Sequence, residues 1–378
     1  MSKILLTCIG ECCKINLLKK YGGKKQLISG IHYNFSFDEA IIERLYEDSE
    51  KNLSYKEFKN SIYLKIARNY LRYRWLIVYL LGASPIVHES FIDSCKCPLK
   101  KIKHSEYSSL GAISHRNGKC GYKNKVDLFP SYNSVDEHLE SINQYIKDEL
   151  IESHKELYSQ IRLKPSDTKN FKESLLNDGI KYLEYRTIDI NPFEKGGISL
   201  EDLRFLQVFN IYLLTKEESD FKNWQEEALE NQQLIAVHGI DDIELKQDGK
   251  VINRIDFGLE ILNEVMSVNN ELNLGFEDII NNMIDKVKDS KLTYSYKITE
   301  KIKEEGYIDA FLNLARMYKE SAYKNRFKLE GYEDLELSTQ ILMKESIKRG
   351  ITVNLVDRSE NFISLKKNEK IEYVKQAT

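Results

Sequence analysis

Residues 180–193 read IKYLEYRTIDINPF, and the alternation inside this stretch determines the expected fold. The charged residues Glu184 and Arg186 alternate with apolar or uncharged neighbours, a period of two that is typical of a β-strand. Asn191-Pro192 ends the strand, because proline cannot continue a sheet ladder. Positions two apart on a strand face the same side. Glu184 and Arg186 therefore form either a structural ion pair or a metal ligand beside a phosphate clamp.

Helical periodicity dominates the sequence on both sides of this strand. Ser54 with Glu57 forms a capping box, and apolar residues then recur at helical spacing until Gly82 and Pro85. A second capping box, Ser134 with Glu137, predicts a helix that runs to about residue 161. Further helices are expected over residues 38–48, 199–214 and most of 256–346, and residues 216–233 form an acidic, amphipathic stretch.

Weaker signals predict a smaller β component. Residues 247–250, QDGK, are typical of a hairpin turn. Residues 352–356 and 362–365 read as strands between polar turns, whereas 92–133 reads as a loop. Since no repeat or linker is visible, we expect the α+β class, with a large helical component.

Composition excludes several classes of protein. A net charge of −3 gives no global field for nucleic acid or anionic lipid, so neither is expected as a partner. The longest apolar run, 75–83, is about half of what a bilayer requires. These features predict a cytoplasmic protein whose six cysteines are thiols.

Four groups of residues could carry chemistry, although a P-loop and a dinucleotide-binding turn are both absent. They are QLISGIHYNF (26–35), Ser114-His115-Arg116 with GYKNK (121–125), the Glu184-x-Arg186 pair, and YSQIRLK (158–164) at an expected helix end. Spacing alone leaves each of them open to a structural interpretation, such as a satisfied core histidine or a charged surface loop.

Together these segments resemble the bacterial glutamate–cysteine ligase family. The resemblance rests on five stretches in the family's order: ISGIHYNFS (28–36), ARNYLRYRWLIVYLLGASP (67–85), Arg116 with GYKNK, ELYSQIR (156–162) and IKYLEYRTIDINPF (180–193). ELSTQILMKESIKRGI (336–351) resembles the bifunctional glutathione-synthesising branch, in which an ATP-grasp ligase follows.

The resemblance implies a glutamine-synthetase-like antiparallel sheet that forms a funnel around ATP and Mg²⁺ or Mn²⁺. It implies ATP-dependent ligation of the γ-carboxyl of L-glutamate to L-cysteine through a γ-glutamyl phosphate, the first step of glutathione biosynthesis. The implied partners are these small molecules.

The resemblance also implies a role for each of ten residues. Arg186 acts on the transferred phosphate, Glu184 binds metal, and Arg116 holds a substrate carboxylate. Tyr122 and Tyr158 line the cysteine pocket, and His32 and Asn34 lie near the substrates. The ATP contacts are Gln26, Arg162 and Lys164.

The sequence departs from the family at its start. Only 27 residues precede Ile28, with Glu11 as their single carboxylate, so the funnel is expected to be incomplete and its metals underligated. We therefore expect a catalytic domain over 1–349 without its first strands, and a β-rich tail over 350–378 that leads toward an absent ATP-grasp domain. The alternatives are an enzyme completed by a protein partner that supplies strands, a catalytically incompetent fragment or pseudoenzyme, and a helical interaction protein.

Overall fold

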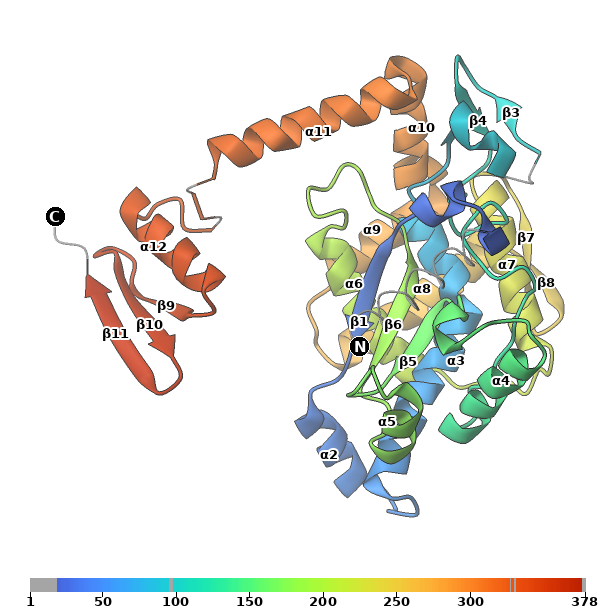
Figure 1. Cartoon of the computed structure of the whole chain (residues 1–378), viewed down its shortest axis with the longest axis horizontal. Coiled ribbons are helices and arrows are strands. Elements are labelled where there is room, and N and C mark those ends of the chain that lie inside the picture. Colours follow the sequence, from blue (N-terminus) through green and yellow to red (C-terminus); the bar gives the residue numbers. More distant parts are fainter. Residues whose placement is uncertain (1–18, 95–97, 327, 330, 376–378) are drawn as a thin grey trace, which may run out of the picture. The chain divides into compact units, whose positions relative to one another are not determined.

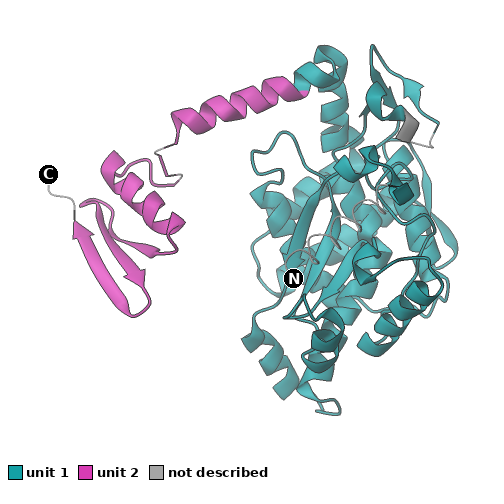
Figure 2. Cartoon of the chain, in the orientation of Figure 1, with its two compact units in different colours: residues 1–310 teal, residues 311–378 magenta. Residues whose placement is uncertain are grey.

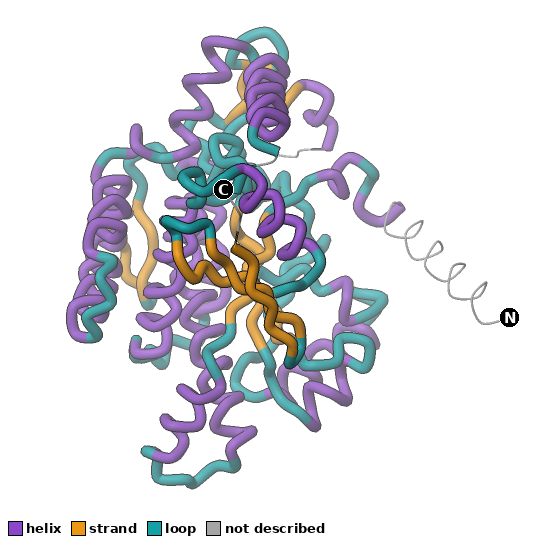
Figure 3. The backbone as a smooth tube through the Cα atoms, turned by 90° about the vertical axis from the view of Figure 1, so that its left-hand side faces the viewer, coloured by secondary structure: helices purple, strands orange, loops and turns teal. Residues whose placement is uncertain are grey.

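A computed structural model describes residues 19–94, 98–326, 328–329 and 331–375. The polypeptide divides into two compact units, residues 1–310 and 311–378 (Figure 2). Helices predominate and the strands form small antiparallel sheets (Figure 3), which confirms the α+β class. None of the described helices is long and apolar enough to cross a bilayer.

The sheet that carries the predicted site residues has the order β1-β6-β5, with β6 in the centre (Figure 1). Its strands are β1 (Ile31–Phe35), β5 (Ile161–Lys164) and β6 (Tyr182–Ile188), and both pairings are antiparallel. Within the described residues the sheet does not close into a barrel. The strand expected around Glu184 and Arg186 is confirmed.

Helix α3 (Tyr55–Leu81) supports one face of this sheet. Both halves of its predicted capping box form between Ser54 and Glu57. Tyr70 on α3 packs edge-on against Tyr185 on β6, with 4.3 Å between ring centroids. Large buried side chains such as Trp75 each stabilise the fold by roughly 1.5–3 kcal/mol. The apolar face of the sheet is therefore fixed against α3, and its other face carries the polar residues.

The remaining elements of unit 1 surround this pair of layers. Helices α6 (Leu200–Thr215) and α7 (Trp224–His238) pack on α3. The predicted hairpin joins β7 to β8, and positive φ angles of 51° at Asp248 and 77° at Gly249 are those of a type I′ turn. The others are η1 (Lys24–Leu27), α2 (Glu39–Glu47), β2 (Val87–His88), η2 (Glu89–Ser94), β3 (Lys100–Lys101), β4 (Glu106–Ser108), α4 (Val135–Lys147), η3 (His154–Glu156), α5 (Phe171–Asn177), β7 (Glu244–Gln247), β8 (Lys250–Asn253), α8 (Arg254–Glu271), α9 (Glu277–Lys288), η4 (Ser290–Leu292), α10 (Tyr294–Glu305) and α11 (Tyr307–Lys324), the last of which continues into unit 2.

The prediction that the helix from Ser134 runs to about residue 161 is wrong. Helix α4 ends at Lys147, and Glu149 adopts a left-handed conformation that stops it. Arg162 and Lys164 consequently lie on strand β5 and not at a helix end. The short alternation IRLK is strand because β5 pairs with β6, a contact that local periodicity does not reveal.

Unit 2 has a small core of its own. Helix α12 (Leu337–Lys348) covers a sheet of order β11-β10-β9, with Met343 and Ile363 buried between them. Strands β9 (Thr352–Asp357) and β10 (Phe362–Lys367) confirm the two predicted strands, and β11 (Lys370–Lys375) was not predicted. The domain boundary at 349/350 stays a prediction.

One expectation about the cysteines is wrong. Cys120 is disulfide-bonded, not a thiol. The other five cysteines, like Glu11, lie outside the described residues.

Candidate active site

The register of the sheet places the predicted charged residues on one face. Asn34 on β1 lies opposite Glu184 on β6, and Glu184 lies opposite Arg162 on β5. Because Tyr185 points toward α3, Glu184 on the alternate position points away from it. Lys164, two residues from Arg162, shares this face. The result is a polar row that crosses all three strands.

An irregularity in β6 changes the direction of Arg186. Ile31 pairs with Ile188 and Tyr33 with Tyr185, so two β6 residues, Arg186 and Thr187, lie opposite His32 alone. Such a β-bulge re-aims side chains and is common beside active sites. Arg186 and His32 both line a cavity of about 310 Å³.

Glu184 is a buried carboxylate with a lysine, an arginine and a histidine around it. Its Oε2 lies 3.0 Å from Lys164 Nζ and 3.9 Å from His32 Nδ1, and its Oε1 lies 3.9 Å from Arg186 Nε. Burial acts to raise the pKa of Glu184, but the hydrogen bond from Lys164 and the nearby positive charges bring this pKa below its ordinary value. Oε1 is buried and accepts no hydrogen bond from the described part of the chain. Glu184 is thus ionised, with one oxygen available to a ligand.

Arg186 and His32 complete this group. Burial lowers the pKa of Arg186, and its Nη1 is buried without a hydrogen-bond acceptor among the described residues. An unpaired N–H on a desolvated cation is a strong binding group for an anion. Burial and the charge of Arg186 also lower the pKa of His32, so its imidazole is neutral near pH 7.

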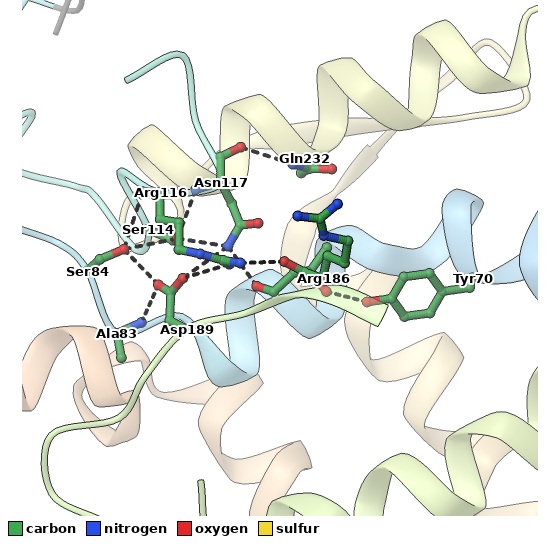
Figure 4. Close-up of polar contacts among 10 residues, drawn as sticks. Tyr70, Ala83, Ser84, Ser114, Arg116, Asn117, Arg186, Asp189 and Gln232 are labelled. Atoms are coloured by element: carbon green, nitrogen blue, oxygen red, sulfur yellow. Dashed lines mark hydrogen bonds and ion pairs between the residues drawn. The ribbon is translucent and has the colours of Figure 1, made fainter. Parts of the chain in front are cut away.

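Arg116 reaches the same cavity from the loop after β4, held by a network around Asp189 (Figure 4). Its Nη1 donates to Asp189 Oδ1 at 3.3 Å, and its Nη2 donates to the carbonyl of Arg186 at 2.6 Å. Asp189 Oδ2 accepts from Ala83 N at 2.9 Å and from Ser84 Oγ at 2.7 Å. These bonds fix the guanidinium. Because an arginine side chain has five N–H donors, it can still donate to a bound ligand.

Gly30 forms the floor under Arg116. A Cβ built on Gly30 would lie 2.2 Å from Arg116 Cζ and 2.4 Å from its Nε. No side chain fits there unless the guanidinium moves. Glycine at position 30 therefore allows Arg116 to pack flat against the backbone.

Two tyrosines form another wall of the site, and a third packs against them. The hydroxyl groups of Tyr122 and Tyr158 lie 2.8 Å apart, and both residues line the cavity. The ring of Tyr21 stands edge-on to both, with centroid distances of 5.4 and 5.6 Å. Burial raises the pKa of Tyr158, which keeps its hydroxyl protonated at neutral pH. These rings make a mainly apolar wall with hydroxyl groups at its rim.

The structure thus brings together most of the predicted residues, but not all of them. Arg116, Tyr122, Tyr158, His32 and Arg186 line the cavity. Glu184 contacts two of these side chains, Asn34 and Arg162 flank it, and Lys164 binds it. Gln26 is exposed on η1 and is not among the cavity-lining residues.

Sequence reasoning missed three residues of this site: Asp189, Gly30 and Tyr21. Asp189 lies three residues after Arg186, inside the quoted strand segment, which is a signal that was available. Tyr21 gives no local signal, because only the fold brings its ring to the other two tyrosines. Among the described residues no group of three His, Cys, Asp or Glu side chains could hold a metal by itself.

Comparison with known proteins identifies the family. The family model described as glutamate-cysteine ligase matches residues 10–151 and 143–235. A second model, an ATP-grasp-like domain, matches residues 333–378.

The relatives and solved structures agree with these matches. The glutathione biosynthesis bifunctional protein GshAB of Clostridium perfringens is 44% identical over 97% of this chain, and that of Listeria monocytogenes is 41% identical over 96%. The chain spans 48% of the length of each, about half.

Two solved structures have the same fold. The bifunctional glutathione synthetase of Pasteurella multocida superposes with a TM-score of 0.77 at 29% identity, covering 96% of this chain and 46% of that one. A glutamate–cysteine ligase of Francisella tularensis, in complex with AMP, gives 0.71 at 25% identity, covering 91% and 74%. This chain therefore belongs to the glutamate–cysteine ligase family.

Proposed function

We propose that this chain catalyses the ATP-dependent ligation of the γ-carboxyl of L-glutamate to L-cysteine, the first step of glutathione biosynthesis. One observation carries the proposal: a single cavity collects Arg116 and Arg186, with the ionised Glu184 against two of its lining residues. Carboxylate activation by ATP requires cations for the transferred phosphoryl group and an oxygen ligand for a metal.

The first step of the proposed reaction transfers the γ-phosphoryl group. An oxygen of the glutamate γ-carboxylate attacks the terminal phosphorus of ATP, the bond to ADP breaks, and a γ-glutamyl phosphate forms. Arg186 presents a buried N–H, which has no acceptor within the described chain, to the charge on the moving phosphoryl oxygens. Because this cation is already desolvated and held by the bulge, it needs no reorganisation during the reaction.

A divalent cation, Mg²⁺ or Mn²⁺, fits at Glu184. The carboxylate is ionised, and its Oε1 is buried and free of hydrogen bonds within the described chain. Such an oxygen is a suitable ligand for a hard divalent cation. One protein carboxylate together with the phosphates of ATP is a common way to hold Mg²⁺. When bound, the metal supplies charge neutralisation to the phosphate oxygens. Lys164 binds the other oxygen, Oε2, and so fixes the orientation of the carboxylate.

The second step joins cysteine. Its amine attacks the acyl carbon, the bond to phosphate breaks, inorganic phosphate leaves, and the amine loses a proton. The proposed receptor for the cysteine carboxylate is the fixed guanidinium of Arg116. The rings of Tyr122 and Tyr158 offer a wall for the side chain, since thiols pack well against aromatic edges.

The cellular location of the proposed activity follows from its substrates. ATP, glutamate and cysteine are cytoplasmic metabolites, and we propose that location. The proposal also retains a protein partner, which would add strands at an edge of the β1-β6-β5 sheet. The family match and the assembled cavity favour a ligase over the catalytically incompetent alternative.

The test is phosphate release by the purified chain with ATP, Mg²⁺, glutamate and cysteine. We expect release that requires both amino acids and that Glu184→Gln abolishes. The matched control is Glu230→Gln, which removes the carboxylate of an exposed ion pair with Lys246 and should leave the rate unchanged. Equal rates for the wild type and Glu184→Gln would reject the proposal.

A further inference from the structure

Glu156 is a buried carboxylate that the proposed reaction does not use. It is the last residue of η3, and it is not among the residues that line the cavity of the site. Its Oε1 accepts a hydrogen bond from the hydroxyl of Tyr21 and lies 2.5 Å from Nζ of Lys20, and its Oε2 accepts from the N–H of Glu152 at 2.6 Å. Burial acts to raise the pKa of Glu156, but these hydrogen bonds and the charge of Lys20 bring this pKa below its ordinary value. Glu156 is therefore an ionised group that holds other side chains.

The hydroxyl of Tyr21 links this carboxylate to the tyrosine wall, which consists of Tyr122 and Tyr158. Tyr21 does not line the cavity itself, but its ring packs edge-on against both rings of the wall. Burial and the hydrogen bond to Glu156 raise the pKa of Tyr21, so its hydroxyl keeps the proton that it donates. A hydroxyl that donates to an ionised carboxylate makes one of the stronger hydrogen bonds in a protein. Glu156 thus fixes the ring that supports the wall.

Asn124 connects the same point to the backbone of the wall. Its Nδ2 donates to the carbonyl of Glu156 at 2.8 Å and to the hydroxyl of Tyr21 at 3.2 Å. Its Oδ1 accepts from the backbone N–H of Tyr158 at 2.9 Å. Asn124 is buried and follows Tyr122 by two residues, so short connections join both wall residues to Glu156. A buried network whose polar groups are paired in this way holds one geometry.

The same anchor holds the segment that enters the cavity from the other direction. Besides its ion pair with Glu156, Lys20 donates to the carbonyl of Leu150 at 3.1 Å. Two consecutive residues, Lys20 and Tyr21, are thus bound to the loop that follows α4. The chain then passes through η1 to Ile28 and Ser29, which line the cavity. Loss of the anchor would loosen the cavity lining on two sides.

We infer that Tyr21 and Glu156 are positioning residues for cysteine: Glu156 holds the hydroxyl of Tyr21, and Tyr21 holds the tyrosine wall where it receives the substrate side chain. This inference rests on the proposed function, because the wall is the proposed receptor for that side chain. Neither residue lines the cavity, so both act through Tyr122 and Tyr158. Their contribution belongs to the binding of cysteine and not to phosphoryl transfer.

Tyr21→Phe tests the inference, because it removes one hydroxyl group and keeps the ring. In steady-state phosphate release the KM for cysteine should rise by about fivefold, within the effect of losing one hydrogen bond to a charged group. The kcat and the KM for ATP should stay within about twofold, a split that general destabilisation would not produce. Tyr55→Phe is the matched control. The hydroxyl of Tyr55 donates to Glu39, which also binds Lys59, and none of these three residues lines the cavity.

A double variant tests whether the two residues act through one link. Glu156→Gln alone should also raise the KM for cysteine, because the uncharged amide holds Tyr21 and Lys20 less firmly. Tyr21→Phe combined with Glu156→Gln should stay within about twofold of the more impaired single variant, since members of one network are not additive. Effects that multiply, to about 25-fold if each is fivefold, would show two independent roles and overturn the inference.

Cysteine binding without turnover separates this inference from the proposed function. Isothermal titration calorimetry of the whole chain with cysteine would compare the wild type, Tyr21→Phe and Tyr55→Phe. If Tyr21→Phe keeps the KM and the affinity for cysteine of Tyr55→Phe, the positioning role is overturned and the ligase proposal stands. If the wild type releases no phosphate, but Tyr21→Phe binds cysteine about fivefold more weakly than Tyr55→Phe, the ligase proposal fails and the positioning role stands. A wild-type chain that neither releases phosphate nor binds cysteine overturns both.

Discussion

Replacing Gly30 with alanine should impair cysteine binding while leaving the fold intact. The added Cβ would overlap the guanidinium of Arg116, at 2.2 Å from Cζ and 2.3 Å from Nη2. These atoms are the far end of a flexible side chain, so the clash is relieved when Arg116 swings away. The movement breaks its hydrogen bonds to Asp189 and to the carbonyl of Arg186.

The expected magnitudes follow from those two bonds. A hydrogen bond to a charged group contributes roughly 1.5–3 kcal/mol, and a displaced Arg116 no longer offers such bonds to a substrate carboxylate. The KM for cysteine should therefore rise at least about tenfold, which is roughly 1.4 kcal/mol. The KM for ATP should stay within about twofold, because Arg186 and Glu184 are not displaced. The melting temperature should fall by only a few degrees, roughly 2–4 °C for each kcal/mol lost.

The assay is steady-state phosphate release at varied cysteine, with melting followed in parallel. Gly196→Ala is the matched control, since its Cβ would meet nothing nearer than a carbonyl oxygen at 3.8 Å. Arg116→Lys provides a second route to the same defect, because lysine lacks the fork of donors. If Gly30→Ala folds and keeps the KM for cysteine of Gly196→Ala, Arg116 does not hold cysteine and the reasoning is refuted.

Three further predictions concern the same site. Asp189→Asn removes a buried charge that accepts four hydrogen bonds. It should lower the free energy of unfolding, measured by urea titration, by about 3 kcal/mol. A loss below about 1 kcal/mol would contradict the structural role given to the Asp189 network. The pKa of Glu184 is lower in the folded state than in the unfolded state, so the ionised carboxylate stabilises the fold fully above about pH 4.5, and this stabilisation is lost as the pH falls through the folded-state pKa. The melting temperature of the wild type should therefore fall in acid, and that of Glu184→Gln should fall less. EDTA should abolish phosphate release, and added Mg²⁺ should restore it. Activity that persists in EDTA would refute the proposed metal site at Glu184.

The sequence predicted those parts of the fold that local rules determine. The capping box at Ser54, the alternation around Glu184 and the QDGK turn each depend on residues within a few positions, and all three form. The same holds for the two strands of the tail. Local consistency of this kind is what makes an element predictable.

The misassigned and missed features depend on distant contacts. IRLK became a strand through pairing with residues about 20 positions away, so Arg162 was placed at a helix end. The bond from Arg116 to Asp189 spans 73 positions, and the packing of Arg116 on Gly30 spans 86. Neither leaves a periodic trace in a single sequence. The family resemblance supplied Arg116 but not the groups that fix it.

The most direct test of the account follows oxygen from glutamate to phosphate. The chain is incubated with ATP, Mg²⁺, cysteine and glutamate labelled with ¹⁸O in the γ-carboxyl group, and the released phosphate is analysed by mass spectrometry. The account predicts one ¹⁸O in each phosphate released, and none above background with Glu184→Gln. Phosphate that forms without the label would show that the γ-carboxylate is not phosphorylated, and would contradict the proposed role of the cavity formed by Arg116, Arg186 and their neighbours.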